Sequence, residues 1–282
     1  MEEDKSFTFN LLKTPNFLDA PEIQENIFKW GLYKYSSTCT FSFDKEFIPS
    51  IDNLSFITSF FESSNVKDSL KFKDISGKPS ISLSSMDLDS SKSIDYDTIP
   101  VNITTMNFFN RLVSSNLICL PKSKKKAASM SSLPLKECMW HPIDVKGTEI
   151  EAHTTLDCAV FDEEDDEYYL FEPTERKEFI FQLFQHVLLG GSMNQYDIVC
   201  EGYLGTTKWL YKHLIKMTKI TRGSSLIAEI SLSSRCSVFK IKSIFGTCPF
   251  HSSDIRNFMF IIVDQKKRTV TVWHHECYHI MF

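Results

Sequence analysis

Residues 175–217 constrain the fold of this chain more than any other segment, because they read as two strongly apolar helices joined by a polar, glycine-marked connection. The first helix is expected to have Thr174 as its N-cap and to end at Gly190 and Gly191. Its apolar stripe consists of Phe179, Leu183, Phe184, Val187 and Leu188. The second helix is expected to begin near Thr206 and to present Trp209, Leu210, Leu214 and Met217. Neither helix carries a convincing catalytic constellation, so the pair indicates packing and binding partners rather than chemistry.

The rest of the chain alternates between strand and helix patterns. Helices are expected over residues 21–30, after Asn53, and after Thr104 or Thr105. Alternating apolar residues predict strands over residues 7–11, 39–43, 156–161, 168–171 and 239–241. Residues 258–263 and 269–273 are expected to pair as a hairpin across the polar turn at 264–268. The predicted fold class is therefore α+β, with helices packed on a largely antiparallel sheet.

The chain is expected to form a single α+β domain over residues 1–282. Two segments with thin periodicity are predicted to be flexible, a Ser/Asp-rich one near 76–98 and a lysine-containing linker at 121–147. The linker also leaves open a division into an N-terminal half, 1–120, and a C-terminal half, 148–282.

Composition excludes several classes of protein. A net charge of −5 and a pI of about 5.9 argue against a nucleic-acid-binding protein with a dominant basic surface. No apolar run reaches the length of a membrane span, since the run at 258–263 is interrupted by Asp264, so no membrane insertion is expected. The acidic first residues lack the pattern of a secretory signal, and the eight scattered cysteines fit reduced thiols in the cytosol.

The C-terminal tail carries the sharpest local signal for chemistry. If the last strand continues, His275, Cys277 and His279 point to one face, and these residue types bind zinc. A fourth ligand could come from Cys138 or His141. No second zinc-knuckle pair is present, so surface histidines on a structural tail are the expected interpretation, with no metal and no cofactor.

Other candidate sites have ordinary explanations. The acidic run 162–167 fits a solvated hairpin tip, with calcium or a basic partner as alternatives. The cluster Lys122 and Lys124–Lys126 fits a solvated linker, with a localisation or phosphorylation-sensitive patch as the alternative. Residues 202–208 lack the spacing of a phosphate-binding loop and fit a turn with a helix cap, although a helix start there could receive an anion.

No arrangement of residues supports catalysis. His186 and His213 lie within the two apolar helices, where each fits a satisfied, partly buried histidine better than a catalytic base. No nucleophile elbow and no cysteine with a catalytic frame is present. We therefore expect a protein that is not an enzyme and has no catalytic residues.

Several segments together resemble a known family. They are RKEFIFQLFQHVLLGG at 176–191, SMNQYDIVCEGYLGTTKWLYKHLIK at 192–216, CSVFKI at 236–241 and FMFIIVDQKKRTVTVWHHECY at 258–278. In the N-terminal half, FFNRLVSSNLI at 108–118 and, more loosely, residues 28–47 extend the likeness. With these segments in the same order, the chain resembles the cilia- and flagella-associated protein 300 family. The Ser/Asp-rich loop, the lysine linker and the histidine-rich end depart most from the family pattern.

The resemblance implies a non-enzymatic factor needed to assemble outer and inner axonemal dynein arms, or to deliver them by intraflagellar transport. Its implied partners are dynein axonemal assembly factors, with the intraflagellar transport machinery and dynein arm subunits beyond them. Its implied locations are the cytoplasm and the axoneme of the cilium or flagellum. Two alternatives stay open: a zinc-binding module or enzyme that uses His275, Cys277 and His279, and a stable structural subunit of the axoneme.

Overall fold

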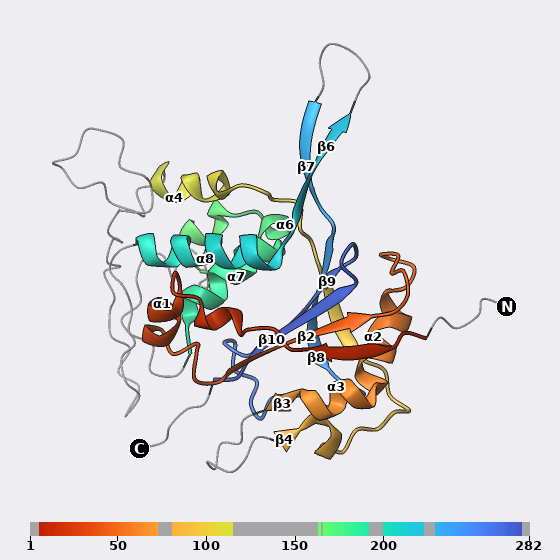
Figure 1. The fold of residues 1–282 in the computed structure, drawn as a ribbon. Helices are drawn as coiled ribbons and strands as arrows, with labels where there is room; N and C mark the ends of the chain where they lie inside the picture. The colour runs from red at the N-terminus through yellow and green to blue at the C-terminus, as the bar shows by residue number, and fades with distance from the viewer. Residues whose placement is uncertain are drawn as a thin grey trace, which may run out of the picture.

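The centre of the protein is a six-stranded antiparallel sheet (Figure 1). The computed structural model describes residues 6–72, 81–114, 163–164, 166–191, 200–222 and 229–277. The strands lie in the order β1-β2-β10-β9-β8-β5, with these bounds: β1 Phe9–Leu12, β2 Ser36–Phe43, β5 Asp95–Ile99, β8 Cys236–Ser243, β9 Phe258–Asp264 and β10 Thr269–His275. The strand that comes last in the described chain therefore pairs directly with one of the first.

The β9–β10 hairpin forms where the sequence predicts it. Thr269 faces Asp264 across the hairpin, and the register continues to His275 opposite Phe258. The Asp264 carboxylate closes the turn by accepting hydrogen bonds from the amides of Lys266 and Lys267, at 3.1 and 3.0 Å. The local turn chemistry thus agrees with the alternation of the strands.

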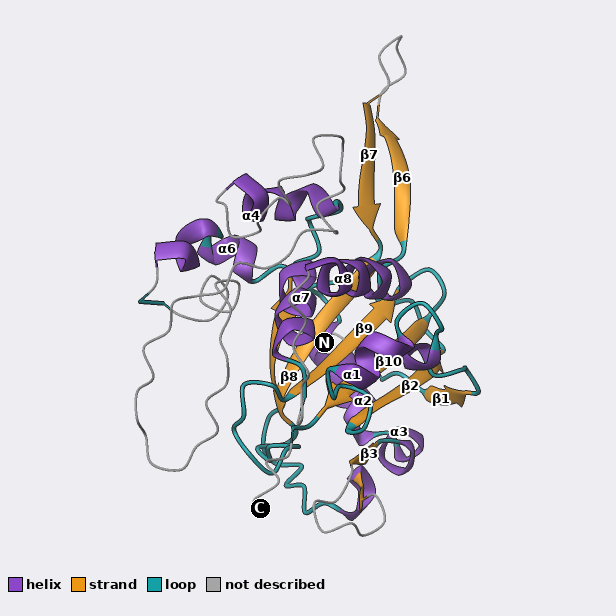
Figure 2. Ribbon diagram, turned by 90° about the vertical axis from the view of Figure 1, so that its left-hand side faces the viewer, coloured by secondary structure: helices purple, strands orange, loops and turns teal. Residues whose placement is uncertain are grey.

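One face of the sheet is covered by helices α7 (Phe179–Leu189), α8 (Cys200–Leu214) and α1 (Gln24–Lys29) (Figure 2). The alternate residues Phe258, Phe260 and Ile262 of β9 point into this core. Trp30, next to α1, stacks on Tyr203 of α8 with ring centroids 4.6 Å apart. The predicted apolar stripe of α7 is buried here, as are its neighbours.

The other face is covered by α2 (Asn53–Glu62) and α3 (Ser64–Ser69). Phe56 of α2 lies at the centre of an aromatic cluster, and its ring centroid is 4.8 Å from that of Phe7 and 5.1 Å from that of Phe43. Met259, Ile261 and Val263 of β9 point into this second core. Since both faces are covered, β9 is apolar at successive positions and not only at alternate ones. These observations confirm the predicted α+β class.

Short elements and a hairpin complete the described chain. The hairpin of β6 (Met217–Arg222) and β7 (Glu229–Ser234) extends away from the main sheet (Figures 1 and 2). The short elements are η1 Phe17–Asp19, β3 Lys71–Phe72, β4 Ile81–Ser82, η2 Leu83–Ser85, η3 Met106–Asn110, α4 Arg111–Ser114, η5 Asp166–Leu170 and α6 Pro173–Arg176. The strand predicted at 156–161 and the linker predicted at 121–147 lie outside the described residues.

Several predicted boundaries are wrong. Helix α8 begins at Cys200, so Gly202 and Gly205 lie inside it and the expected turn and cap at 202–208 do not exist. The strand predicted at 168–171 is instead largely the 3-10 helix η5. The Ser/Asp-rich loop predicted near 76–98 contains strands and ends in β5, an edge strand of the main sheet.

The helix caps also differ from the prediction. Glu172 and Glu175 form a capping box around α6, so Thr174 is not the cap. Helix α7 starts separately after Glu178.

Candidate functional site: an open groove beside α8

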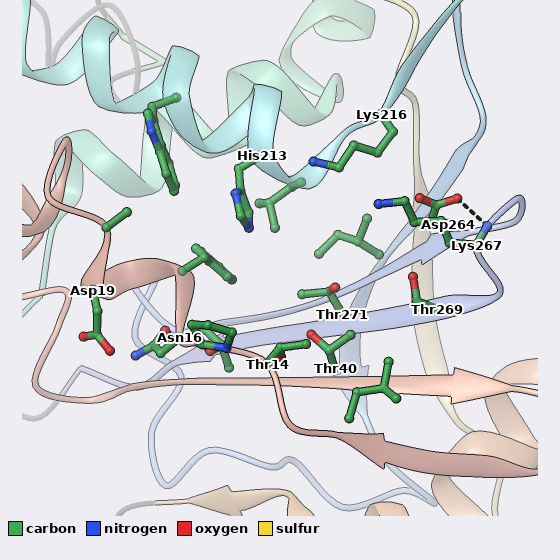
Figure 3. Close-up of a pocket in the computed structure, with 18 of the residues that line it drawn as sticks. Thr14, Asn16, Asp19, Thr40, His213, Lys216, Asp264, Lys267, Thr269 and Thr271 are labelled. Atoms are coloured by element: carbon green, nitrogen blue, oxygen red, sulfur yellow. Dashed lines mark hydrogen bonds between the residues drawn. The ribbon is translucent and has the colours of Figure 1, made fainter.

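A groove with a volume of about 660 Å³ lies between α8, the segment around η1 and the β2–β10 part of the sheet (Figure 3). This volume is within the range of ligand-binding pockets. The residues that line it are Leu12, Thr14, Pro15, Asn16, Phe17, Asp19, Ala20, Pro21, Thr38, Thr40, Trp209, His213, Leu214, Lys216, Ile262, Asp264, Lys267, Thr269 and Thr271.

The floor of the groove is a patch of threonines on two neighbouring strands. Thr40 of β2 faces Thr271 of β10 across the ladder, and Thr38 and Thr269 extend the patch. These residues are on the same face as the first core, because residues two apart in a strand point to the same side. The apolar part of this face lies under α7 and α8, and the threonine part remains partly exposed.

Three of the floor hydroxyls can still form hydrogen bonds with a ligand. Thr38 donates to Asn16 Oδ1 at 2.9 Å. Thr40, Thr269 and Thr271 have no side-chain hydrogen bond within the part of the chain that the structure describes, and each is partly exposed. A hydroxyl both donates and accepts, so the floor suits a backbone or a polar side chain.

One wall is the aromatic C-terminal end of α8. The His213 ring stacks on Trp209 with centroids 4.9 Å apart and an interplanar angle of 7°, and it lies 5.2 Å from the Phe17 ring. Burial lowers the pKa of His213, and the nearby charges of Lys216 and Lys267 lower it further. The imidazole is therefore neutral at pH 7 and contributes stacking and hydrogen bonding rather than charge.

Two lysines from different elements meet at one end of the groove. Lys216 follows α8, Lys267 belongs to the β9–β10 turn, and Figure 3 shows both side chains entering the same end of the groove. Partial burial lowers the pKa of Lys216, and the charge of Lys267 lowers it further. Neither ammonium has an ion pair or hydrogen bond among residues of the described ranges.

The groove also contains two carboxylates, and both already have hydrogen-bond donors. Asp264 accepts from two amides of its own turn, at 3.1 and 3.0 Å. Asp19 accepts from the Tyr33 hydroxyl at 2.7 Å. Because Lys216 and Lys267 outnumber Asp264 at this end, the lysine end keeps a net positive charge.

A second, smaller pocket of about 420 Å³ lies beside α6 and α7, where Arg176, Lys177, Lys240 and Lys242 converge. Two of its charged side chains already bind other groups of the protein. Lys242 pairs with Asp97 at 2.8 Å, and Arg176 donates to the carbonyl oxygens of Phe171 and Tyr168.

Two of the histidines singled out in the sequence, His186 and His275, are core residues, so His275 is not the surface histidine that was expected. His186 of α7 is buried, its Nε2 lies 3.4 Å from Lys240 Nζ, and burial lowers its pKa well below the ordinary value. His275 is also fully buried, with Nδ1 3.2 Å from Ser36 Oγ. It lies on the first-core side of the sheet, 5.8 Å from the Phe258 ring.

The candidate zinc ligands are only partly placed. Cys277 is buried, and its amide donates to Asn257 Oδ1 at 2.7 Å. His279, Cys138 and His141 lie outside the described residues. Within the described ranges, no group of three or more histidine, cysteine or acidic residues is placed to hold a metal ion. The zinc site therefore stays an untested alternative.

The described residues of the acidic run do not line the groove. Glu163, Glu164 and Asp166 of the acidic run are exposed, and Glu163 accepts a hydrogen bond from Tyr168. The cluster Lys122 and Lys124–Lys126 lies outside the described residues. Among the described helices, none is both long and apolar enough to cross a membrane.

Sequence reasoning considered His213 but missed the groove around it. Threonines at alternate positions of β2 and β10 are ordinary strand residues, and Lys216 and Lys267 are 51 positions apart in the numbering. The one available signal was the change from apolar to polar residues along the same face of β10, from Trp273 to Thr271 and Thr269.

Known proteins with similar sequences share one description. The sequence pattern of the family described as cilia- and flagella-associated protein 300 matches residues 6–275. A protein of that name from Paramecium tetraurelia is 24% identical over 255 residues, which cover 90% of this chain and 87% of the relative. One from Chlamydomonas reinhardtii is 33% identical over 117 residues, which cover 40% of this chain and 43% of the relative. No solved structure matches. The match over nearly the whole chain shows that this protein belongs to the cilia- and flagella-associated protein 300 family.

Proposed function

We propose that this protein is a non-enzymatic factor that helps to assemble outer and inner axonemal dynein arms, or to deliver them by intraflagellar transport. The observation that carries the proposal is the family match over residues 6–275, because the family is named for its association with cilia and flagella. The proposed locations are the cytoplasm, where arms would be assembled, and the axoneme, where they would be delivered.

The shape of the groove supports action through protein contacts. It is open, it combines hydroxyls, an aromatic wall and two ammonium groups, and it holds no nucleophile paired with a base. Such a mixed polar and aromatic surface is typical of recognition sites. The proposed partners are dynein axonemal assembly factors, and beyond them the intraflagellar transport machinery and dynein arm subunits.

The decisive experiment is deletion of the gene in a ciliated cell, followed by electron tomography of the axonemes. We expect axonemes of normal length that lack outer and inner dynein arms and beat weakly or not at all. Re-expression of the full chain should restore the arms. Normal arms in the deletion strain would contradict the proposal.

Fractionation separates an assembly factor from a permanent axonemal subunit. We expect most of the protein in the detergent-soluble cytoplasmic fraction of cells that are growing cilia. A pool that remains entirely with extracted axonemes would instead fit a stable structural subunit. Proximity labelling during growth of the cilia would then identify the partners.

A further inference from the structure

We propose that the groove between α8 and the β2–β10 threonines binds an extended, acidic peptide segment of a partner protein. The inference deepens the proposed function and rests on it in one respect, namely that the chain works by binding other proteins. It adds a place on the molecule and the chemistry of the partner.

The charge at one end of the groove selects an acidic occupant. Lys216 and Lys267 come from elements that are separate in the sequence, and their side chains enter the same end of the groove (Figure 3). Each repels the other, and no carboxylate of the described chain pairs with either ammonium. A glutamate or aspartate side chain from outside would relieve this repulsion and form a charge-assisted hydrogen bond with each lysine.

Asp264 offsets part of this attraction, because its carboxylate lies near enough to Lys216 to raise the pKa of that lysine. Asp264 is held by two amides of its turn, and Asp19 by the Tyr33 hydroxyl. His213 is neutral at pH 7, because burial and the two lysines lower its pKa. With two ammonium groups and one carboxylate among the described residues, the lysine end keeps a net positive charge that a ligand can meet.

The floor of the groove favours an extended chain over a compact one. Thr40 and Thr271 face each other across the ladder, with Thr269 beyond them toward the lysine end. Side chains of an extended segment alternate between its two sides, so every second residue would face this floor. The free hydroxyls can bond to the backbone or the side chains of such a segment.

The aromatic wall on α8 offers an apolar surface, to which an apolar side chain of the peptide can bind. Trp209 and Leu214 line the groove on the α8 side, and Leu12 lines it from β1. An apolar residue two positions from the acidic one, on the same side of the extended segment, would pack against Trp209 while the carboxylate reaches the lysines. The expected motif is therefore an extended segment with an acidic residue and an aliphatic or aromatic residue two positions away.

The test uses the full chain as bait for a phage-displayed library of random eight-residue peptides, with counterselection on the Lys216→Glu/Lys267→Glu double variant. We expect the enriched peptides to carry Asp or Glu with an apolar residue two positions away. An enriched set with no excess of acidic residues, or no enrichment over the counterselected bait, overturns the inference.

The most enriched peptide is then synthesised with a fluorescein label and titrated by fluorescence anisotropy. The double variant should bind it about tenfold or more weakly, and 0.5 M salt should weaken the wild-type interaction. Lys266→Glu is the matched control for the single variant Lys267→Glu, since it makes the same charge change in the same turn at an exposed residue that does not line the groove. Equal loss of binding in Lys266→Glu and Lys267→Glu would show a general charge effect and overturn the inference.

Additional variants and competitors distinguish a partner peptide from other possible ligands of the groove. Thr40→Trp fills the floor without a change of charge and should also weaken binding, while circular dichroism confirms that each variant is folded. Glutarate that competes as well as the peptide would make this a small-acid site. Dimerisation lost in the double variant would assign the groove to a second copy, and much tighter binding after removal of residues 1–5 would assign it to the protein's own acidic start. Competition by glutarate, dimerisation lost in the double variant, and tighter binding after removal of residues 1–5 would each overturn the inference.

This experiment and the gene deletion fail separately. If the deletion removes dynein arms and no acidic peptide binds, the inference falls and the proposed function stands. If acidic peptides bind and the deletion leaves normal arms, the groove remains a peptide site and the proposed function falls.

Discussion

Protonation of His275 should make this protein unstable in mild acid. The imidazole is fully buried between the sheet and the first core, and burial lowers its pKa from 6.5 to about 3. The hydrogen bonds of Ser36 explain why the neutral ring fits. Trp273 Nε1 donates a hydrogen bond to Ser36 Oγ at 3.3 Å. The hydroxyl proton of Ser36 is therefore available to His275 Nδ1, which lies 3.2 Å from Ser36 Oγ. Protonation of Nδ1 would place two donors against each other in a buried site.

The sign and size of the effect follow from proton linkage. Between pH 6.5 and pH 3 the unfolded chain binds a proton at His275 and the folded chain does not, so the free energy of unfolding falls as the pH falls. At about 1.36 kcal/mol per pKa unit, His275 alone should cost about 2 kcal/mol by pH 5. That is a substantial part of the roughly 5–15 kcal/mol that stabilises a typical protein. His186, whose pKa is also lowered by burial, acts in the same direction.

The assay is urea unfolding of the wild type and of His275→Gln at pH 7.5 and pH 5.0, followed by tryptophan fluorescence. Glutamine can still accept from Ser36 but does not titrate in this range. Carboxylates titrate in both proteins, so the relevant quantity is the difference between the two pH-induced losses of stability, which should be about 2 kcal/mol. Equal losses in the two proteins, within about 0.5 kcal/mol, would refute the reasoning.

Four further predictions concern stability and are read from urea or thermal unfolding at pH 7.5. Gly191→Ala should destabilise the protein by more than about 2 kcal/mol, because the new Cβ would lie 2.4 Å from a backbone carbonyl oxygen. Gly205→Ala, inside α8 with nothing within 4 Å, should instead stabilise it by about 0.5–1 kcal/mol, and the same sign for both alanine variants would contradict this. Glu178→Ala should cost about 2–3 kcal/mol, since its buried carboxylate accepts from two amides and a side-chain amide at 2.9–3.3 Å, and an unchanged midpoint would show that water replaces it. Arg111→Lys should cost about 1 kcal/mol because an ammonium cannot make the paired 2.6 and 2.7 Å bonds to the Glu175 carboxylate, with Arg111→Ala as the larger-effect comparison.

The parts of the fold that the sequence predicted have strong, local patterns. The stripe on α7 repeats at helical spacing, and Gly190 ends that helix with a φ of 64°. The β9–β10 hairpin combines two apolar runs with a polar turn. In both elements the apolar residues that recur at helical or strand spacing are also the residues buried in the core. The local sequence pattern and the tertiary structure therefore agree.

The parts that were missed depend on tertiary contacts. Strand β5 contains exposed polar residues, and only Ile99 is buried, so its alternation cannot be seen without its partner β8. The first turns of α8 contain two glycines, which favour a turn locally, but Tyr203 between them is buried against Trp30. The groove itself could not be predicted, because it exists only where α8 leaves part of the sheet face uncovered.

The central position of β10 also determines when this protein can fold during synthesis. Thr269–His275 pairs with β2 on one side and β9 on the other, so the two halves of the sheet are joined only by a strand made after almost all of the other described residues. On the ribosome, β1 and β2 therefore emerge long before the strand that joins them to β8 and β9, with their apolar residues uncovered in the meantime. Until residue 275 has left the exit tunnel, the nascent chain cannot complete its sheet.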